Sequence, residues 1–87
     1  MLRISRSTNG QVVYTLSGRI HKEHIAELET LIVGEVQGRR IVLDLTDVTL
    51  VDQDGVSFLE RCEVSGITLK NCPPYIREWI KRQRSGS

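Results

Sequence analysis

This sequence has no long apolar run, few cysteines and few aromatic residues, and its charges almost cancel. Hydrophobic residues make up 39% of the 87 positions, but no stretch approaches the ~20 apolar residues that a membrane-spanning helix needs. Met1 does not open the pattern of a signal peptide. The formal net charge of +1 gives no strong field that would attract a polyanion. We therefore expect no membrane insertion and no nucleic-acid partner.

Cysteine and histidine are scarce, which argues against a metal centre built from these residues. Cys62 and Cys72 form no CxxC motif and are too few for a disulfide framework, so we expect reduced packing residues, as is typical of a cytoplasmic protein. His21 and His24 stand three positions apart. Zinc would need about two further ligands, and the cysteines are remote in sequence. We therefore predict solvated loop histidines, no metal site and no cofactor.

The hydrophobic periodicity of the first half predicts two strands and a helix. Apolar and polar residues alternate over residues 2–7 and 11–16, around Asn9-Gly10. This dipeptide is the strongest short signal for a hairpin, so we expect two antiparallel strands there. Apolar residues at helical spacing predict an amphipathic helix over residues 24–33 that ends at Gly34.

The second half predicts alternating strands and helices. The apolar, β-forming run at residues 41–45 suits a strand covered on both faces, and Thr46-Asp47 should break it. A short second helix is expected from about 55 to 63, and a further strand over residues 67–71. Pro73-Pro74 then opens a third helix, because proline fits the first helical turn.

The expected fold is α/β, in the order β-β-α-β-α-β-α. It combines a small mixed β-sheet, with an N-terminal hairpin and then parallel strands, with helices packed against it. We expect a single domain over residues 1–82 and a flexible C-terminal tail at residues 83–87. Asp44 lies between two leucines of a buried-looking strand. Because burying a lone charge is costly, we expect it near the strand end, bonded to a backbone amide.

The most distinctive stretch is Asp52-Gln53-Asp54-Gly55, which follows an apolar run. A strand that ends in D-x-D-G resembles the first motif of haloacid-dehalogenase-type phosphatases. In those enzymes the aspartates are a nucleophile and a general acid beside magnesium. Lys70 is available on the next strand, but no later acidic pair completes a magnesium site. An Asp-dependent phosphatase-like fragment is therefore the weakest of the interpretations.

The order and spacing of four longer segments resemble a STAS domain, the sulfate-transporter and anti-sigma-factor-antagonist family. The segments are VVYTLSGRI (Val12–Ile20), IAELETLI (Ile25–Ile32), RRIVLDLTDVTLVDQDGVSFL (Arg39–Leu59) and GITLKNCPPYIREWI (Gly66–Ile80). They are similar to the family's second strand, its first helix, its central strand with the D-S-S/T-G loop and the helix after it, and its next strand and helix. The resemblance implies a non-catalytic protein-interaction module in cytoplasmic regulation.

In the STAS family the D-S-S/T-G loop is a partner-facing switch, whose first serine is phosphorylated by a partner kinase. Asp52 and Gly55 match this motif, whereas Gln53 stands at the phosphoacceptor position and Asp54 at the second serine or threonine. Glutamine has no hydroxyl, and the single charge of Asp54 falls short of the about −1.5 to −2 of a phosphate. The resemblance thus implies a docking surface whose switch is lost. Its residues would be Asp52, Gln53, Asp54, Gly55, Val56 and Ser57.

The resemblance also implies the class of partner. An anti-sigma-factor kinase, a larger regulatory complex and a transporter-associated ATPase all remain possible, and we expect a monomer or a weak homodimer. A small-ligand or nucleotide-binding domain is the alternative, with an anion at the N-terminus of the second helix. Against it, Asp52 and Asp54 would repel a phosphate and the loop has no glycine-rich cradle.

The aspartates and the glycine of this loop also have a purely structural interpretation. Either Asp52 or Asp54 could cap the second helix, and Gly55 could simply allow a tight turn. Further along, Trp79 stands at helical spacing from isoleucines and is expected in the core rather than as a ligand platform. The basic end of the chain, Lys81 to Arg84, is expected to be solvated.

Overall fold

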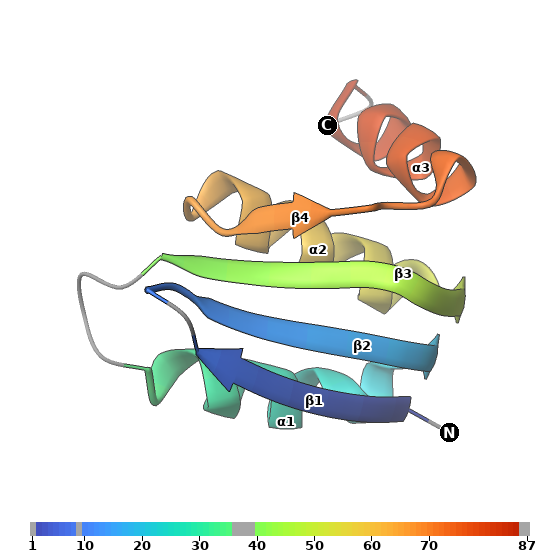
Figure 1. Ribbon diagram of the computed structural model, residues 1–87. Helices are drawn as coiled ribbons and strands as arrows, with labels where there is room; N and C mark the ends of the chain where they lie inside the picture. The colour runs from blue at the N-terminus through green and yellow to red at the C-terminus, as the bar shows by residue number, and fades with distance from the viewer. Residues whose placement is uncertain (1, 9, 36–39, 86–87) are drawn as a thin grey trace.

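The protein folds as a four-stranded mixed sheet with three helices, as the computed structural model describes it for residues 2–8, 10–35 and 40–85 (Figure 1). The elements are β1 (Leu2–Thr8), β2 (Val12–Ile20), α1 (Lys22–Val33), β3 (Ile41–Val51), α2 (Gln53–Val64), β4 (Thr68–Lys70) and α3 (Pro74–Ser85). The predicted order of elements is confirmed. None of the helices in the described ranges has the length and apolar character to cross a membrane.

The strands lie in the order β1-β2-β3-β4, and only the first pair is antiparallel. The predicted hairpin is confirmed, since Leu2 pairs with Gly18 and Thr8 with Val12. Gly10 has a φ of 81°, in the left-handed region that glycine adopts easily. Asn9, the other half of the predicted turn, lies outside the described residues.

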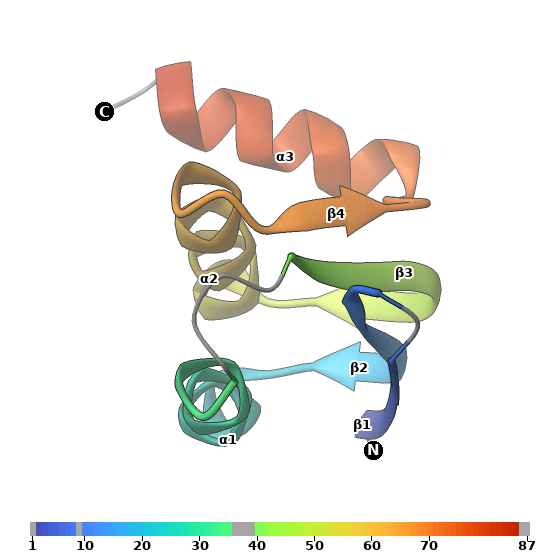
Figure 2. The same cartoon turned by 60° about the vertical axis from the view of Figure 1, so that its left-hand side comes forward.

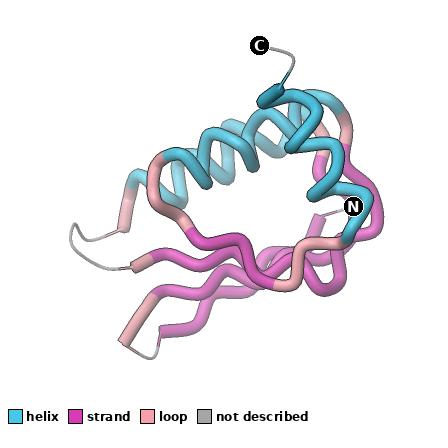
Figure 3. Tube along the Cα trace, turned by 90° about the horizontal axis from the view of Figure 1, so that it is seen from above, coloured by secondary structure: helices cyan, strands magenta, loops and turns pink. Residues whose placement is uncertain are grey.

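The helices gather on one face of the sheet (Figures 2 and 3). Helices α1 and α2 lie across this face, and α3 lies beyond the β4 edge, next to α2. Strand β3, whose residues 41–45 were expected to be covered on both faces, therefore has helices on one face only. Leu43 and Leu45 are fully buried in the core cluster beneath the helices. Val42 lies on the opposite face of the strand, outside this cluster. Its exposure is nevertheless only 5%, and Val13 and Thr68 lie beside it on the neighbouring strands.

The predicted break at Thr46-Asp47 is wrong, because β3 runs through it to Val51. The pairing between β2 and β3 does shift there. Thr15 pairs with Asp44, but Ser17 pairs with Asp47, so β3 contains one extra residue. Such a bulge changes which side chains face the core. A second shift follows, and the buried residues of β3 then recur at Leu45, Val48 and Val51 instead of alternating.

Asp44 belongs to this irregular stretch. The expectation that it lies near the strand end is therefore wrong. The predicted bond to a backbone amide is confirmed. Oδ1 of Asp44 accepts hydrogen bonds from the Thr46 hydroxyl at 2.6 Å and from the Thr46 N–H at 3.0 Å. The hydroxyl, followed by the amide, holds the pKa of Asp44 below its usual range. The carboxylate therefore fixes the backbone where the register shifts.

Helix α3 begins at Pro74, and the carbonyl of Pro73 accepts hydrogen bonds from Ile76 and Arg77 N–H groups. Ile76 and Ile80 are buried in the core, and Trp79 packs against it while partly exposed. The helix continues to Ser85, so residues 83–85, which were predicted to begin a flexible tail, are helical. Residues 86–87 lie outside the described part.

Candidate functional site

The D-Q-D-G sequence occupies the junction between β3 and α2, and Asp52 binds both helices that begin nearby. Asp52 is the N-cap of α2, since its Oδ1 accepts the Gly55 N–H at 2.8 Å. Its Oδ2 accepts the N–H of Lys22, the first residue of α1, at 3.0 Å. Of the two aspartates, Asp52 therefore caps the helix, and one carboxylate holds the first turns of α1 and α2 together.

The surroundings of Asp52 favour its charged form. Burial disfavours ionisation, but the hydrogen bonds from Gly55 and Lys22 outweigh it, with a further contribution from nearby His21. The pKa of Asp52 is therefore lowered, and the group is ionised at neutral pH. Both of its oxygens are already engaged by backbone N–H groups.

His21 and His24 lie at the start of α1, where both side chains are partly buried, so the expectation of solvated loop histidines is wrong. The His21 N–H donates to Nδ1 of His24 at 3.1 Å, which satisfies an amide at the helix start. Nδ1 of His21 is 3.8 Å from Oδ2 of Asp52. In the described ranges, no three His, Cys, Asp or Glu side chains are grouped so that they could hold a metal ion.

Gly55 and Val56 were expected on the docking surface, but both are buried. A Cβ at Gly55 would lie 3.1 Å from the carbonyl oxygen of Ile20 and 3.2 Å from its Cγ2. Glycine thus allows α2 to approach the end of β2 closely. The side chain of Val56 is fully buried in the core. These two residues can shape the surface from beneath but do not offer side chains to a partner.

The surface of the junction is formed by Gln53 and Asp54, which are exposed, and by Ser57, which is half-buried. Nε2 of Gln53 donates to Oε1 of Gln83 at 2.7 Å, and Nε2 of Gln83 donates to the Ser57 hydroxyl oxygen at 2.8 Å. A chain of hydrogen bonds thus joins the start of α2 to the end of α3. Gln83 was expected in the tail, although its spacing from Ile76 and Ile80 continues the helical pattern.

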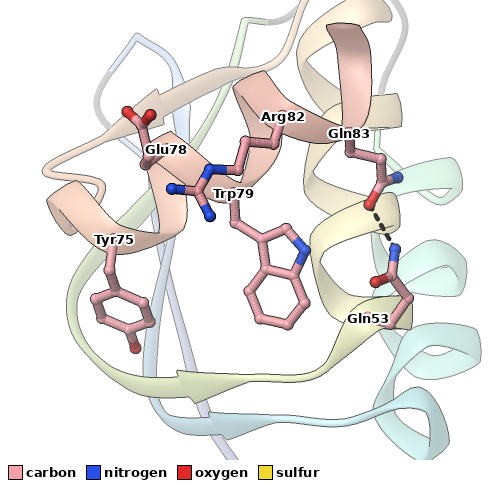
Figure 4. Close-up of a pocket in the computed structure, with 6 residues that line it drawn as sticks. All are labelled: Gln53, Tyr75, Glu78, Trp79, Arg82 and Gln83. Atoms are coloured by element: carbon pink, nitrogen blue, oxygen red, sulfur yellow. Dashed lines mark hydrogen bonds between the residues drawn. The ribbon is translucent and has the colours of Figure 1, made fainter. Parts of the chain in front are cut away.

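A surface groove, which we name the α3 groove, lies between Gln53 and α3 (Figure 4). Its volume is about 500 Å³, and it is lined by Gln53, Tyr75, Glu78, Trp79, Arg82 and Gln83. Tyr75 is 47% exposed, and its hydroxyl donates to the Thr49 carbonyl at 2.7 Å. Trp79 packs against the core and also forms part of the wall of this groove.

The two cysteines are free thiols, as predicted. Cys62 is buried in the core, and burial raises its pKa to about 12. Burial also raises the pKa of the partly buried Cys72. Raised pKa values keep both groups in the unreactive thiol form, which suits packing residues.

Comparison with known proteins gives a family and a fold. The family model of the STAS domain matches residues 3–65. The solved structure of the anti-sigma factor antagonist SpoIIAA, in its unphosphorylated form, is similar with a TM-score of 0.63 and 22% identity, over 93% of this chain and 82% of that one. No curated protein matches the chain.

Two further solved structures are similar. Mglu has a TM-score of 0.57 and 22% identity, over 83% of this chain but only 19% of its own. An uncharacterized DUF3478-family protein from Shewanella loihica PV-4, with a SpoIIAA-like fold, has a TM-score of 0.52 and 11% identity, over 98% of this chain and 77% of that one. At these identities the similarities establish the fold alone.

Proposed function

The chain belongs to the STAS domain family, and on this premise we propose that it is a non-catalytic protein-docking module of cytoplasmic regulation. The observation that supports this most is the construction of the β3–α2 junction. Asp52 is used internally to hold two helices, while Gln53 and Asp54 are presented to solvent on the first turn of α2. A rigid support beneath exposed polar residues is what a docking site requires.

We propose that docking here is not controlled by phosphorylation of the loop. Gln53 stands where a STAS switch has its phosphoacceptor serine, and it has no hydroxyl. Its amide is instead hydrogen-bonded to Gln83 of α3. Gln53 is also uncharged, so it does not imitate a phosphate. The loop should therefore remain in the equivalent of the unphosphorylated state.

The contacts of Asp52 support a non-catalytic role. A nucleophilic or metal-binding aspartate needs an oxygen that is free to reach substrate or metal. Both oxygens of Asp52 accept hydrogen bonds from the backbone instead. Asp54 is exposed in the first turn of α2 and is separate from these contacts. The two aspartates therefore have different roles and do not act as a catalytic pair.

The proposed partner is a protein: an anti-sigma-factor kinase, a larger regulatory complex or a transporter-associated ATPase. The similarity to SpoIIAA suggests this class without selecting among its members. We propose that the chain binds it as a monomer or weak homodimer. Affinity purification with mass spectrometry would identify the partner.

Once the partner is identified, the Gln53→Glu variant tests the docking surface. The added charge should weaken binding about fivefold, or ~1 kcal/mol, as a charge at an interface rim does. Gln11→Glu is the matched control, since it makes the same chemical change just before Val12, at the other end of β2. Calorimetry would give both affinities. Equal affinities for wild type and both variants would show that the junction is not the interface.

The alternative of an anion or nucleotide at the α2 N-terminus is weaker. The lowered pKa of Asp52 keeps a negative charge at this helix end, and exposed Asp54 adds another. Both would repel a phosphate, despite the favourable helix dipole. Titration with nucleotides should therefore give no binding heat, and a saturable signal would favour the alternative.

A further inference from the structure

The α3 groove has the composition of a protein-binding hot spot. The docking surface proposed at the β3–α2 junction does not by itself account for this composition. Tyr75 and Trp79 project from α3 to the side on which Gln53 lies, with Arg82 beside them (Figure 4). Exposed aromatic and arginine side chains are enriched where protein interfaces gain most of their affinity. Since Gln53 belongs to both the groove and the junction surface, the two are continuous.

The charges of α3 indicate which partner chemistry would fit. The helix contains four basic residues and one acidic residue, Glu78. Glu63 of α2 binds two of the basic ones, Arg77 at 2.7 Å and Arg84 at 2.8 Å. Lys81 and Arg82 form no ion pair within the described part of the chain. The exposed side of α3 is therefore basic, whereas the start of α2 is acidic through Asp54.

We propose that the α3 groove binds an acidic segment of the protein partner. An apolar side chain of this segment lies against Tyr75 and Trp79, and a neighbouring carboxylate binds the guanidinium of Arg82. Arginine suits this role because its fork of N–H donors matches a carboxylate. Glu78, which also lines the groove, disfavours a second carboxylate near Tyr75 and so restricts the orientation of the segment. This inference rests on the proposed docking function and assigns the chemistry of its partner.

Trp79 provides the measurement, because it is the single tryptophan of the chain. Its fluorescence reports directly on the groove, without the natural partner. The probes are short synthetic peptides without aromatic residues: one with glutamates flanking a leucine, one with lysines in place of the glutamates, and one with serine in place of the leucine. A single-stranded oligonucleotide is the rival polyanion.

Two charge reversals separate a specific site from general attraction. Arg82→Glu removes the cation of the groove, and Lys81→Glu makes the same change of net charge at the adjacent residue, which does not line the groove. Both side chains are exposed, so both variants should fold, and thermal unfolding checks this. We expect the glutamate–leucine peptide to change Trp79 emission saturably, with affinity reduced about tenfold by Arg82→Glu and little by Lys81→Glu.

Four results would overturn the inference: no saturable change with the glutamate–leucine peptide, equal binding of the lysine or serine peptide, equal losses in both variants, or a response to the oligonucleotide alone. Its failure is distinguishable from failure of the docking function. The peptide titration does not involve the partner, so a partner affinity that is sensitive to Gln53→Glu would still support docking at the junction.

Discussion

Asp52 and Asp54 of the β3–α2 junction have different roles, because α2 begins between them at Gln53. Helix α2 was expected from about residue 55, whereas it begins at Gln53, so Asp52 precedes the helix and Asp54 lies inside it. Capping depends on this boundary, which local periodicity defines poorly. The second contact of Asp52, with Lys22, joins residues far apart in the chain and leaves no local sequence signal.

The role of Asp52 can be tested by stability measurements. Asp52→Ala should lower the free energy of unfolding by about 2 kcal/mol, because the N–H groups of Gly55 and Lys22 both lose their acceptor. Asp52→Asn should cost about half as much, since one acceptor oxygen remains. Asp54→Asn, at the exposed position of the same turn, is the control and should change stability by less than about 0.5 kcal/mol. Urea denaturation at neutral pH gives these values.

The same variants should respond to pH. The pKa of Asp52 is lowered in the folded protein, so its stabilising effect is complete above the unfolded pKa of about 4 and is lost as the pH falls through the folded pKa. The stability difference between wild type and Asp52→Asn should therefore narrow below about pH 4. A constant difference, or a larger loss in Asp54→Asn than in Asp52→Ala, would contradict the assigned roles.

At the level of strands and helices, hydrophobic periodicity predicted their type and order. It did not predict the ends of those elements whose length is determined by tertiary contacts. The polar Thr46-Asp47 pair suggested a strand end, yet β3 accommodates it as a bulge against β2, with Asp44 bonded to Thr46. The polar end of α3 suggested a tail. It stays helical, with Gln83 and Arg84 hydrogen-bonded to α2.

The attachment of α3 to α2 is also open to measurement. Glu63 is 28% exposed and binds two arginines, whereas Glu29 is 52% exposed and binds Arg61 at 3.2 Å. Glu63→Gln should therefore lower the free energy of unfolding by about 1 kcal/mol, and Glu29→Gln by less than about 0.5 kcal/mol. Chemical denaturation would compare them, and equal costs would mean that the Glu63 cluster does not anchor α3.

At the scale of the whole molecule, the fold class followed from the sequence, but the arrangement of its layers did not. An apolar run predicts burial without saying what covers it, and Val42 is buried on the face that carries no helix. The α3 groove could not be predicted from the sequence either, because it combines Gln53 with side chains of a helix that lies beside α2 only after folding. The STAS resemblance predicted the position of the loop, and the structure separates the exposed residues of this segment from its buried ones.

We propose that a protein partner binds over the β3–α2 junction, and hydrogen exchange of the complex would show whether it does. The N–H groups of Gln53 and Asp54 lie in the first turn of α2, where the helix itself provides no acceptor, so they should exchange rapidly in the free protein. In the complex, we predict slower exchange over residues 52–58. Unchanged exchange there, with protection of another surface such as the exposed edge of β1, would contradict docking at the junction.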